Sequence, residues 1–198
     1  MDEHLEHTRT FFGARAHGWD ERFPDDAPLY DEAVGDLQVR AAQVVVDLGS
    51  GTGRALSSLH RAAGPDAIVL GIDVTPEMLD AARSRAGHDA GALVLADVRS
   101  LPLRAGRVDA FFAAGIVCHV PDPRALFREL AAAAAPGARL AVFHPIGRAA
   151  LAHGHQRTVQ PDELLDPGVL PGVLAECGWL SEHIDDSDRR YFAIARLA

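Results

Sequence analysis

The chain has 198 residues, 48% of them hydrophobic, and a formal net charge of −9. This length and composition suit one domain with a sizeable core and exclude a disordered or fibrous chain. The acidic balance argues against nucleic acid as a partner, because a negatively charged protein repels phosphate backbones.

The first 40 residues are rich in His, Asp and Glu. They begin acidic where a signal peptide would be basic, and no apolar run in the chain reaches bilayer length. We therefore expect a soluble, cytoplasmic protein. All 19 basic residues are arginine, as is typical of a GC-rich genome, and we expect a bacterial source. One or two short helices are predicted outside the main sheet, with an apolar stripe at Leu29, Val34 and Leu37. The aromatic residues scattered along this stretch are Phe11, Phe12, Trp19, Phe23 and Tyr30.

From residue 43 short apolar runs alternate with helical patterns. The runs predict buried parallel strands, because strands covered on both faces are apolar throughout. These strands are expected at residues 43–48, 68–73, 92–96, 108–114 and 139–144. Helices are expected at residues 53–63, 75–85 and 122–134, the last two opening with a capping residue and a proline. The connection from residue 97 to 107 is short enough to lack a full helix.

The last third of the chain completes the pattern. Residues 161–177 look helical, with Gly178 placed to end the helix. Residues 179–184 and 191–197 predict two final strands, which could form a hairpin. This alternation predicts an α/β fold with right-handed crossovers and a mostly parallel sheet.

A glycine-rich turn, residues 49–53, follows the first predicted strand. Glycines allow a tight turn and a close approach of a ligand to the backbone, and the next helix directs free N–H groups at that ligand. The spacing is G-x-G-x-G. In the dinucleotide fingerprint the third glycine would fall at Arg54, which is too bulky for close helix packing. Asp47 before the turn suits an ammonium group better than a pyrophosphate. A nicotinamide-dependent oxidoreductase is therefore the weaker alternative.

Acidic residues also end the next two predicted strands. Asp73 is placed to accept hydrogen bonds from the hydroxyl groups of a ribose. Asp97 could accept a hydrogen bond from an adenine amino group, with the Val98 backbone at the edge of the ring. The alternatives are a solvated loop acid at Asp73 and a cap or turn residue at Asp97.

Taken together, these motifs resemble the class I S-adenosylmethionine-dependent methyltransferases. They are most similar to the small-molecule branch that includes the ubiquinone and menaquinone methyltransferases. Residues 44–53 resemble the first motif of the family, residues 71–79 the second, and residues 96–103 the adenine-binding stretch. The resemblance covers about residues 10–197. It implies a Rossmann-like three-layer sandwich whose mostly parallel seven-stranded sheet has an antiparallel strand near the C-terminus.

The resemblance also implies a function, S-adenosyl-L-methionine-dependent methyl transfer to a small-molecule acceptor by in-line displacement. In a single domain, residues 1–40 would form a helical lid, residues 41–144 the cofactor-binding core, and residues 145–198 a substrate-facing insert with the final strands. The implied cofactor-binding residues are Trp19, Asp47, Gly49, Ser50, Gly51, Gly53, Asp73, Val74, Met78, Asp97, Val98 and Ala114.

One departure from the family lies just after the fourth predicted strand. The family often carries Ser, Asn or Cys there, whereas this chain has Ala113-Ala114-Gly115. Contacts at this point would have to come from the backbone. A protein that binds the cofactor without catalysis is therefore a second alternative.

His119 and His144 are the catalytic candidates, because they follow the fourth and fifth strands and could act as a general base. Turn-capping or core-edge histidines are the alternative for both. His153 and His155 have no obvious third partner, so no metal site is predicted. The short insert favours a small acceptor. We expect no nucleic acid as a partner and no membrane insertion, and a homodimer remains open.

Overall fold

A seven-stranded sheet runs through the part of the chain described by the computed structural model, residues 3–22, 26–41, 43–87 and 91–198. Phe23 and the first two residues, which entered the predictions above, lie outside these ranges. The strands are β1 (Val44–Leu48), β2 (Ile68–Asp73), β3 (Ala92–Leu95), β4 (Val108–Ala114), β5 (Ala134–His144), β6 (Trp179–Asp186) and β7 (Tyr191–Leu197).

The strand order is β3-β2-β1-β4-β5-β7-β6. Strands β1 to β5 pair in parallel, whereas β7 lies antiparallel to both β5 and β6. The predicted sheet, mostly parallel with an antiparallel strand near the C-terminus, is confirmed. The order places the ends of β2 and β3 on one side of β1 and the ends of β4 and β5 on the other.

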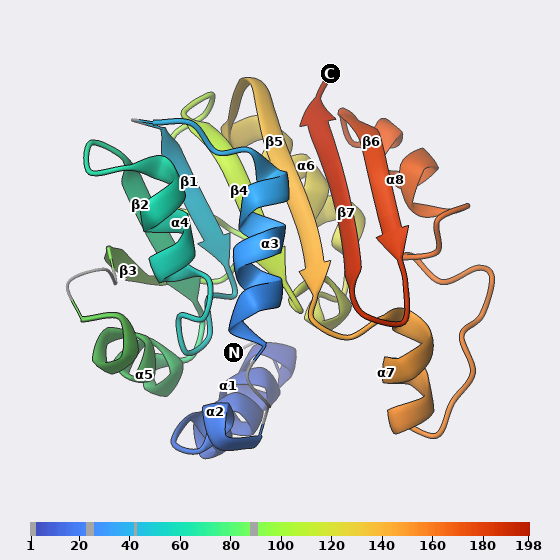
Figure 1. The fold of residues 1–198 in the computed structure, drawn as a ribbon, viewed down its shortest axis with the longest axis horizontal. Coiled ribbons are helices and arrows are strands. Elements are labelled where there is room, and N and C mark those ends of the chain that lie inside the picture. The colour runs from blue at the N-terminus through green and yellow to red at the C-terminus, as the bar shows by residue number, and fades with distance from the viewer. Residues whose placement is uncertain (1–2, 23–25, 42, 88–90) are drawn as a thin grey trace.

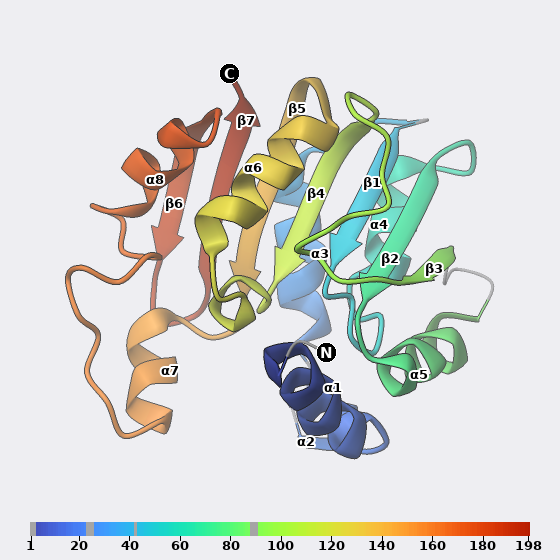
Figure 2. The same cartoon turned by 180° about the vertical axis from the view of Figure 1, so that it is seen from behind.

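Helices cover both faces of the sheet and make three layers. On one face lie α3 (Ala27–Leu37), α4 (Leu56–Ala63) and α5 (Pro76–Ala86), seen in front of or below the strands in Figure 1. On the other face lie α6 (Pro123–Ala133) and α8 (Leu170–Glu176), in front in Figure 2. Each face has its own apolar core, one around Phe111, Phe127 and Trp179, the other around Leu56 and Phe143.

The connection between β3 and β4, residues 96–107, forms no helix, as its length predicts. It crosses the sheet as an extended loop on the α6 side (Figure 2). Val98 and Leu101 are buried there, and Leu103 packs against the same core. Apolar side chains of the loop therefore cover the sheet where a helix would otherwise lie.

Three predictions about helices are corrected. The helix at residues 27–37 is not separate from the sheet but is part of a layer that covers it, because α3 buries Tyr30, Val34 and Leu37 against one face. Helix α4 begins at Leu56 and not at residue 53, since Gly53 has a φ of +78° that belongs to the turn.

The third correction concerns residues 161–177, where the predicted helix is reduced to α8. The side chain of Asp166 accepts a hydrogen bond from the Gly168 N–H at 2.9 Å, and Pro167 between them has no N–H to donate. This turn delays the helix to Leu170. The fifth strand begins earlier than predicted, at Ala134, with an irregular register before Arg139.

Three helices gather beyond the carboxyl ends of the parallel strands: α1 (Glu3–Ala16), α2 (Trp19–Arg22) and α7 (Arg148–Gly154). They lie below the sheet in Figure 1. Ligands of open α/β sheets bind at this edge. Within the described ranges, the helices are all too short or too polar to cross a membrane.

Candidate active site

A cavity of about 630 Å³ lies at the carboxyl ends of the parallel strands, roofed by α1 and α2. Gly53 does not line it. A Cβ atom at this position would lie 3.0 Å from Ala82 Cβ and Leu56 Cδ1, so Gly53 permits close packing of the turn against α5. The other predicted residues do line the cavity: Trp19, Asp47, Gly49, Ser50, Gly51, Asp73, Val74, Met78, Asp97, Val98, Ala114, His119 and His144.

The glycine turn is held to the neighbouring strand by Asp73. Its Oδ2 accepts a hydrogen bond from the Gly51 N–H at 2.9 Å, and its Oδ1 accepts one from the Thr75 N–H at 2.8 Å. The backbone φ values of Gly49 and Gly51 are +62° and +51°, a region that side chains disfavour. Asp73 therefore fixes the shape of the turn in addition to lining the cavity.

Asp47 is the most buried carboxyl group of the cavity, with 2% of its surface exposed. Burial raises the pKa of the Asp47 carboxyl well above its ordinary value, and the nearby Asp73 raises it further. Burial also raises the pKa of Asp73, although backbone N–H groups oppose this shift. Two buried acids side by side form a site that is best stabilised by a cationic group.

Asp97 contacts Arg99, a residue that the sequence did not single out. The Arg99 side chain donates hydrogen bonds to both carboxylate oxygens at 2.6–3.0 Å, and the Arg99 backbone N–H donates at 2.9 Å. These bonds fix the orientation of the Asp97 carboxylate. Arg99 also lines the cavity.

Aromatic side chains of α1 and α2 form part of the roof. The rings of Phe12 and Trp19 have centroids 5.6 Å apart, and Phe12 meets His119 edge to face at 5.2 Å. Helix α1 is attached through polar contacts: Arg9 Nε donates to the Val74 carbonyl at 2.9 Å, and His4 Nε2 lies 3.0 Å from the His119 carbonyl.

Asp20 on α2 is a further residue that sequence reasoning missed. Its Oδ1 accepts a hydrogen bond from Thr52 Oγ1 at 2.8 Å, and its Oδ2 lies 2.9 Å from Arg85. Arg54 pairs with Asp26 and also lies near Asp20. The sequence does contain a Trp19-Asp20 pair, but its partners become clear only when α2 is placed against the glycine turn.

His144 and His119 lie on opposite sides of Gly115 in the chain and both border the cavity. His144 Nδ1 lies 2.9 Å from the Ile146 carbonyl and 3.1 Å from the Ile146 N, which fixes the ring and leaves Nε2 as its second polar atom. Burial lowers the pKa of His144, and so do His119 and His155 nearby. Burial lowers the pKa of His119 as well, with His4 adding to the shift. Both shifts favour the neutral form of the ring.

Comparison with known proteins agrees with this geometry. A family described as a methyltransferase domain matches residues 46–142, which contain the glycine turn, Asp73 and Asp97. Residues 46–142 therefore match a methyltransferase domain. This match supports S-adenosylmethionine, the cofactor that the sequence predicts.

Among curated relatives of the methyltransferase domain, trans-aconitate 2-methyltransferase of Methylobacterium radiotolerans is 35% identical over 128 residues, 65% of this chain and 48% of the relative. This chain spans less than half the length of the first curated relatives that it matches. Two of the solved structures with this fold show the extent of the likeness. A SAM-dependent methyltransferase from Aquifex aeolicus has a TM-score of 0.75 at 20% identity, covering 94% of this chain and 98% of the other.

The second solved structure is magnesium protoporphyrin IX methyltransferase from Synechocystis PCC 6803 with bound SAH. Its TM-score is 0.74 at 17% identity, and the alignment covers 99% of this chain and 100% of the other. At these identities the likeness shows the fold of the methyltransferase domain.

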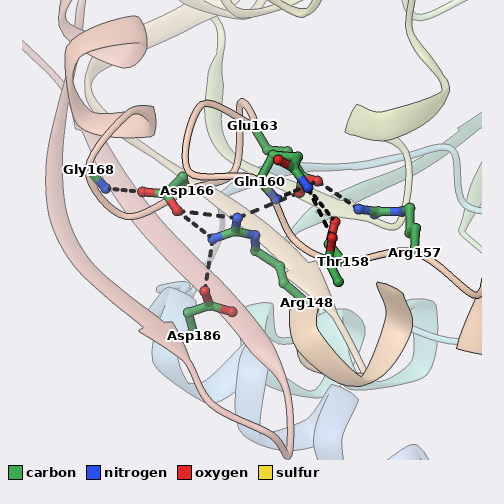
Figure 3. Close-up of polar contacts among 8 residues, drawn as sticks. All are labelled: Arg148, Arg157, Thr158, Gln160, Glu163, Asp166, Gly168 and Asp186. Carbon is green, nitrogen blue, oxygen red and sulfur yellow. Dashed lines mark hydrogen bonds and ion pairs between the residues drawn. The ribbon is translucent and has the colours of Figure 1, made fainter. Parts of the chain in front are cut away.

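One wall of the cavity is fixed from behind by a buried arginine. Arg148, at the start of α7, has 7% of its side chain exposed and lies 2.9 Å from Asp186 and 3.4 Å from Asp166 (Figure 3). Glu163 is a third acid near the same guanidinium, at 3.6 Å. Arg148 thereby joins α7, whose Leu151 lines the cavity, to the end of β6.

We predict that Asp47→Asn stabilises the protein without ligand. The folded state holds the Asp47 proton more tightly than the unfolded state, so the neutral carboxyl contributes stability that is lost as the pH rises from about 4 through its raised pKa. Urea unfolding at pH 5 and pH 7 should show a gain in the variant that is larger at pH 7. Asp66→Asn, at an exposed position, is the control. A variant less stable than the parent at both pH values would contradict the prediction.

We predict that Arg148→Met destabilises the fold by about 3 kcal/mol, because it leaves acids gathered around a lost cation. Arg157→Met is the matched control. Arg157 is exposed and pairs with Glu163 at 2.7 Å, so its loss should cost under about 1 kcal/mol. Urea unfolding of both variants at pH 7 measures the difference, and equal losses would show that the buried ion network is not what holds α7.

Proposed function

We propose that this chain transfers a methyl group from S-adenosylmethionine to a small-molecule acceptor. The observation that carries the proposal is the pair of buried carboxyl groups, Asp47 and Asp73, beside the glycine turn. A pyrophosphate would be repelled there, whereas the ammonium of a sulfonium amino acid would be stabilised. Arg54, where a dinucleotide site needs a glycine, is directed into ion pairs with α2 and Asp26.

The residues present fit the cofactor. Ser50 lines the cavity, and its buried hydroxyl oxygen has no hydrogen-bond partner among the described residues. A Cβ atom at Gly49 would lie 2.9 Å from Ile116, so the turn lies close against the wall. We propose that Asp47 and the turn hold the amino-acid part, Asp73 the ribose, and Asp97 with Val98 the adenine. S-adenosylmethionine supplies a methyl group bonded to a positively charged sulfur, a good leaving group.

The protein's contribution is to hold the acceptor in line and to exclude water. Phe12 and Trp19 close the roof, and the cavity has room for an acceptor of limited size beside the cofactor. This size supports a small molecule. The trans-aconitate relative, by its name, also acts on a small molecule. Membership of the ubiquinone and menaquinone branch is proposed from the sequence motifs.

His144 is the proposed general base. Its Nδ1 is fixed by Ile146, and its Nε2 can accept a proton from the acceptor. His119 is less suited, because its ring packs against Phe12. His119 is proposed to position the acceptor.

We predict that Asp73→Ala lowers the affinity for S-adenosylmethionine about tenfold or more, roughly 1.4 kcal/mol. The change removes the ribose partner and the bond that shapes the turn. Calorimetric titration of the full chain measures the effect, and a thermal melt checks folding. Asp80→Ala is the control, because Asp80 is exposed on α5 and pairs with Arg83. Unchanged affinity in folded Asp73→Ala, or uptake of a nicotinamide dinucleotide in preference, would overturn the proposal.

We predict that His144→Gln lowers the rate of S-adenosylhomocysteine formation about a hundredfold with an acceptor that must lose its proton. Affinity for S-adenosylmethionine should be unchanged. The neutral ring is the base, so the parent rate should be constant above pH 7 and fall as the pH drops through the lowered pKa of His144. A screen of hydroxylated acceptors supplies the substrate. A variant with the parent rate and pH profile would remove His144 from the mechanism.

A further inference from the structure

Building on the proposed function, we propose that the acceptor is an oxygen acid, a carboxylic acid or an acidic hydroxyl compound with an apolar body, and not an amine. Three features of the cavity carry this inference. They are the separation of acidic from imidazole side chains along the chain, the four imidazoles that border the cavity, and the apolar side chains that line the same cavity.

The acidic side chains are confined to the cofactor end of the cavity. Among the described residues that line it, the carboxyl groups are Asp26, Asp47, Asp73 and Asp97. Asp47 lies in β1, Asp73 ends β2 and Asp97 follows β3, while Asp26 pairs with Arg54 beside the glycine turn. None follows β4 or β5, where the acceptor must lie if the cofactor occupies the other end. An amine that is cationic at pH 7 would find no carboxylate partner there, and the sulfonium beside it would repel it.

Imidazole rings border this second end instead. His119 follows β4, His144 ends β5, His155 follows α7, and His4 projects from α1. All four border the one cavity, and His4 Nε2 lies 3.0 Å from the His119 carbonyl. Neutral imidazoles accept the proton of a hydroxyl group or donate N–H to an oxyanion, and protonated ones attract an anion. Each of these interactions favours an acidic oxygen.

Apolar side chains line the same cavity. Three of them come from α1 and from the segment after β5: Leu5 of α1, Ile146, which is 37% exposed, and Leu151 of α7. Such side chains bury a hydrocarbon or aromatic body and leave the polar atom to reach the imidazoles. A compound with one acidic oxygen on an apolar skeleton matches both properties.

The test uses three compounds with one ring system and the same point of substitution: naphthoic acid, naphthol and naphthylmethylamine. Their affinities for the full chain saturated with S-adenosylhomocysteine are measured by calorimetry at pH 7. We expect at least one oxygen acid to bind about tenfold or more tightly than the amine. The tighter of the two shows whether a carboxylate or a hydroxyl is preferred.

Variants assign the preference to the imidazoles. His144→Gln should reduce the preference for the oxygen acid about fivefold or more, a change of about 1 kcal/mol, with unchanged S-adenosylhomocysteine affinity. His183→Gln is the matched control, because His183 is exposed on β6 outside the cavity, and should leave the preference intact.

The outcomes separate this inference from the proposed function. If S-adenosylhomocysteine does not bind, the proposed function fails first. If it binds and the amine equals or exceeds both oxygen acids, or all three compounds fail to bind measurably, the acceptor inference is overturned and the proposed function stands. A preference that persists unchanged in His144→Gln also overturns it.

Discussion

One hydrogen bond organises the cofactor end of this protein, the bond from the Gly51 N–H to the carboxylate of Asp73. It joins the turn after β1 to the end of β2, two strands that already pair in parallel. Because the acceptor is a buried carboxylate, the bond is stronger than one between neutral groups, and it holds a glycine backbone that has little preference of its own. The shape of the turn depends on this contact, whereas Asp47 before it is placed by the pairing of β1 with β2 and β4.

This constraint brings an electrostatic conflict with it. The carboxylate that holds the turn also raises the pKa of Asp47, which is more deeply buried. Without a cation the two acids disfavour each other's ionised form. A positively charged ligand would relieve this repulsion, and the relief would add to its binding free energy. Asp73, which holds the turn, and Asp47, which is proposed to hold the ligand, are therefore electrostatically coupled. A substitution of either one changes the pKa of the other.

Sequence reasoning predicted the parts of the structure that depend on local pattern. The parallel strands were predicted from continuous apolar runs. Asp73 and Asp97 were predicted to reach the site because they stand at the ends of such runs. It failed where side chains meet through tertiary contact. Asp20 and Arg99 gain their partners only when α2 and the β3–β4 loop are placed. Gly53 was assigned to the ligand from the spacing of the motif, and the structure adds a packing role against Ala82 that the spacing does not indicate. The helix expected at residues 161–177 was too long, because the turn formed by Asp166 competes with helical bonding.

Helices α1 and α2, which roof the cavity, bury little of their own surface. Ala16 is buried, but the remaining residues of α1 and α2 are at least partly exposed. Polar contacts of Arg9, His4 and Asp20 join them to the body, beside the aromatic contact of Phe12 with His119. Such polar contacts can be exchanged for water at small net cost. Neither of the two apolar cores includes a residue of α1 or α2, so separation of these helices from the body would leave the packing of the sheet intact.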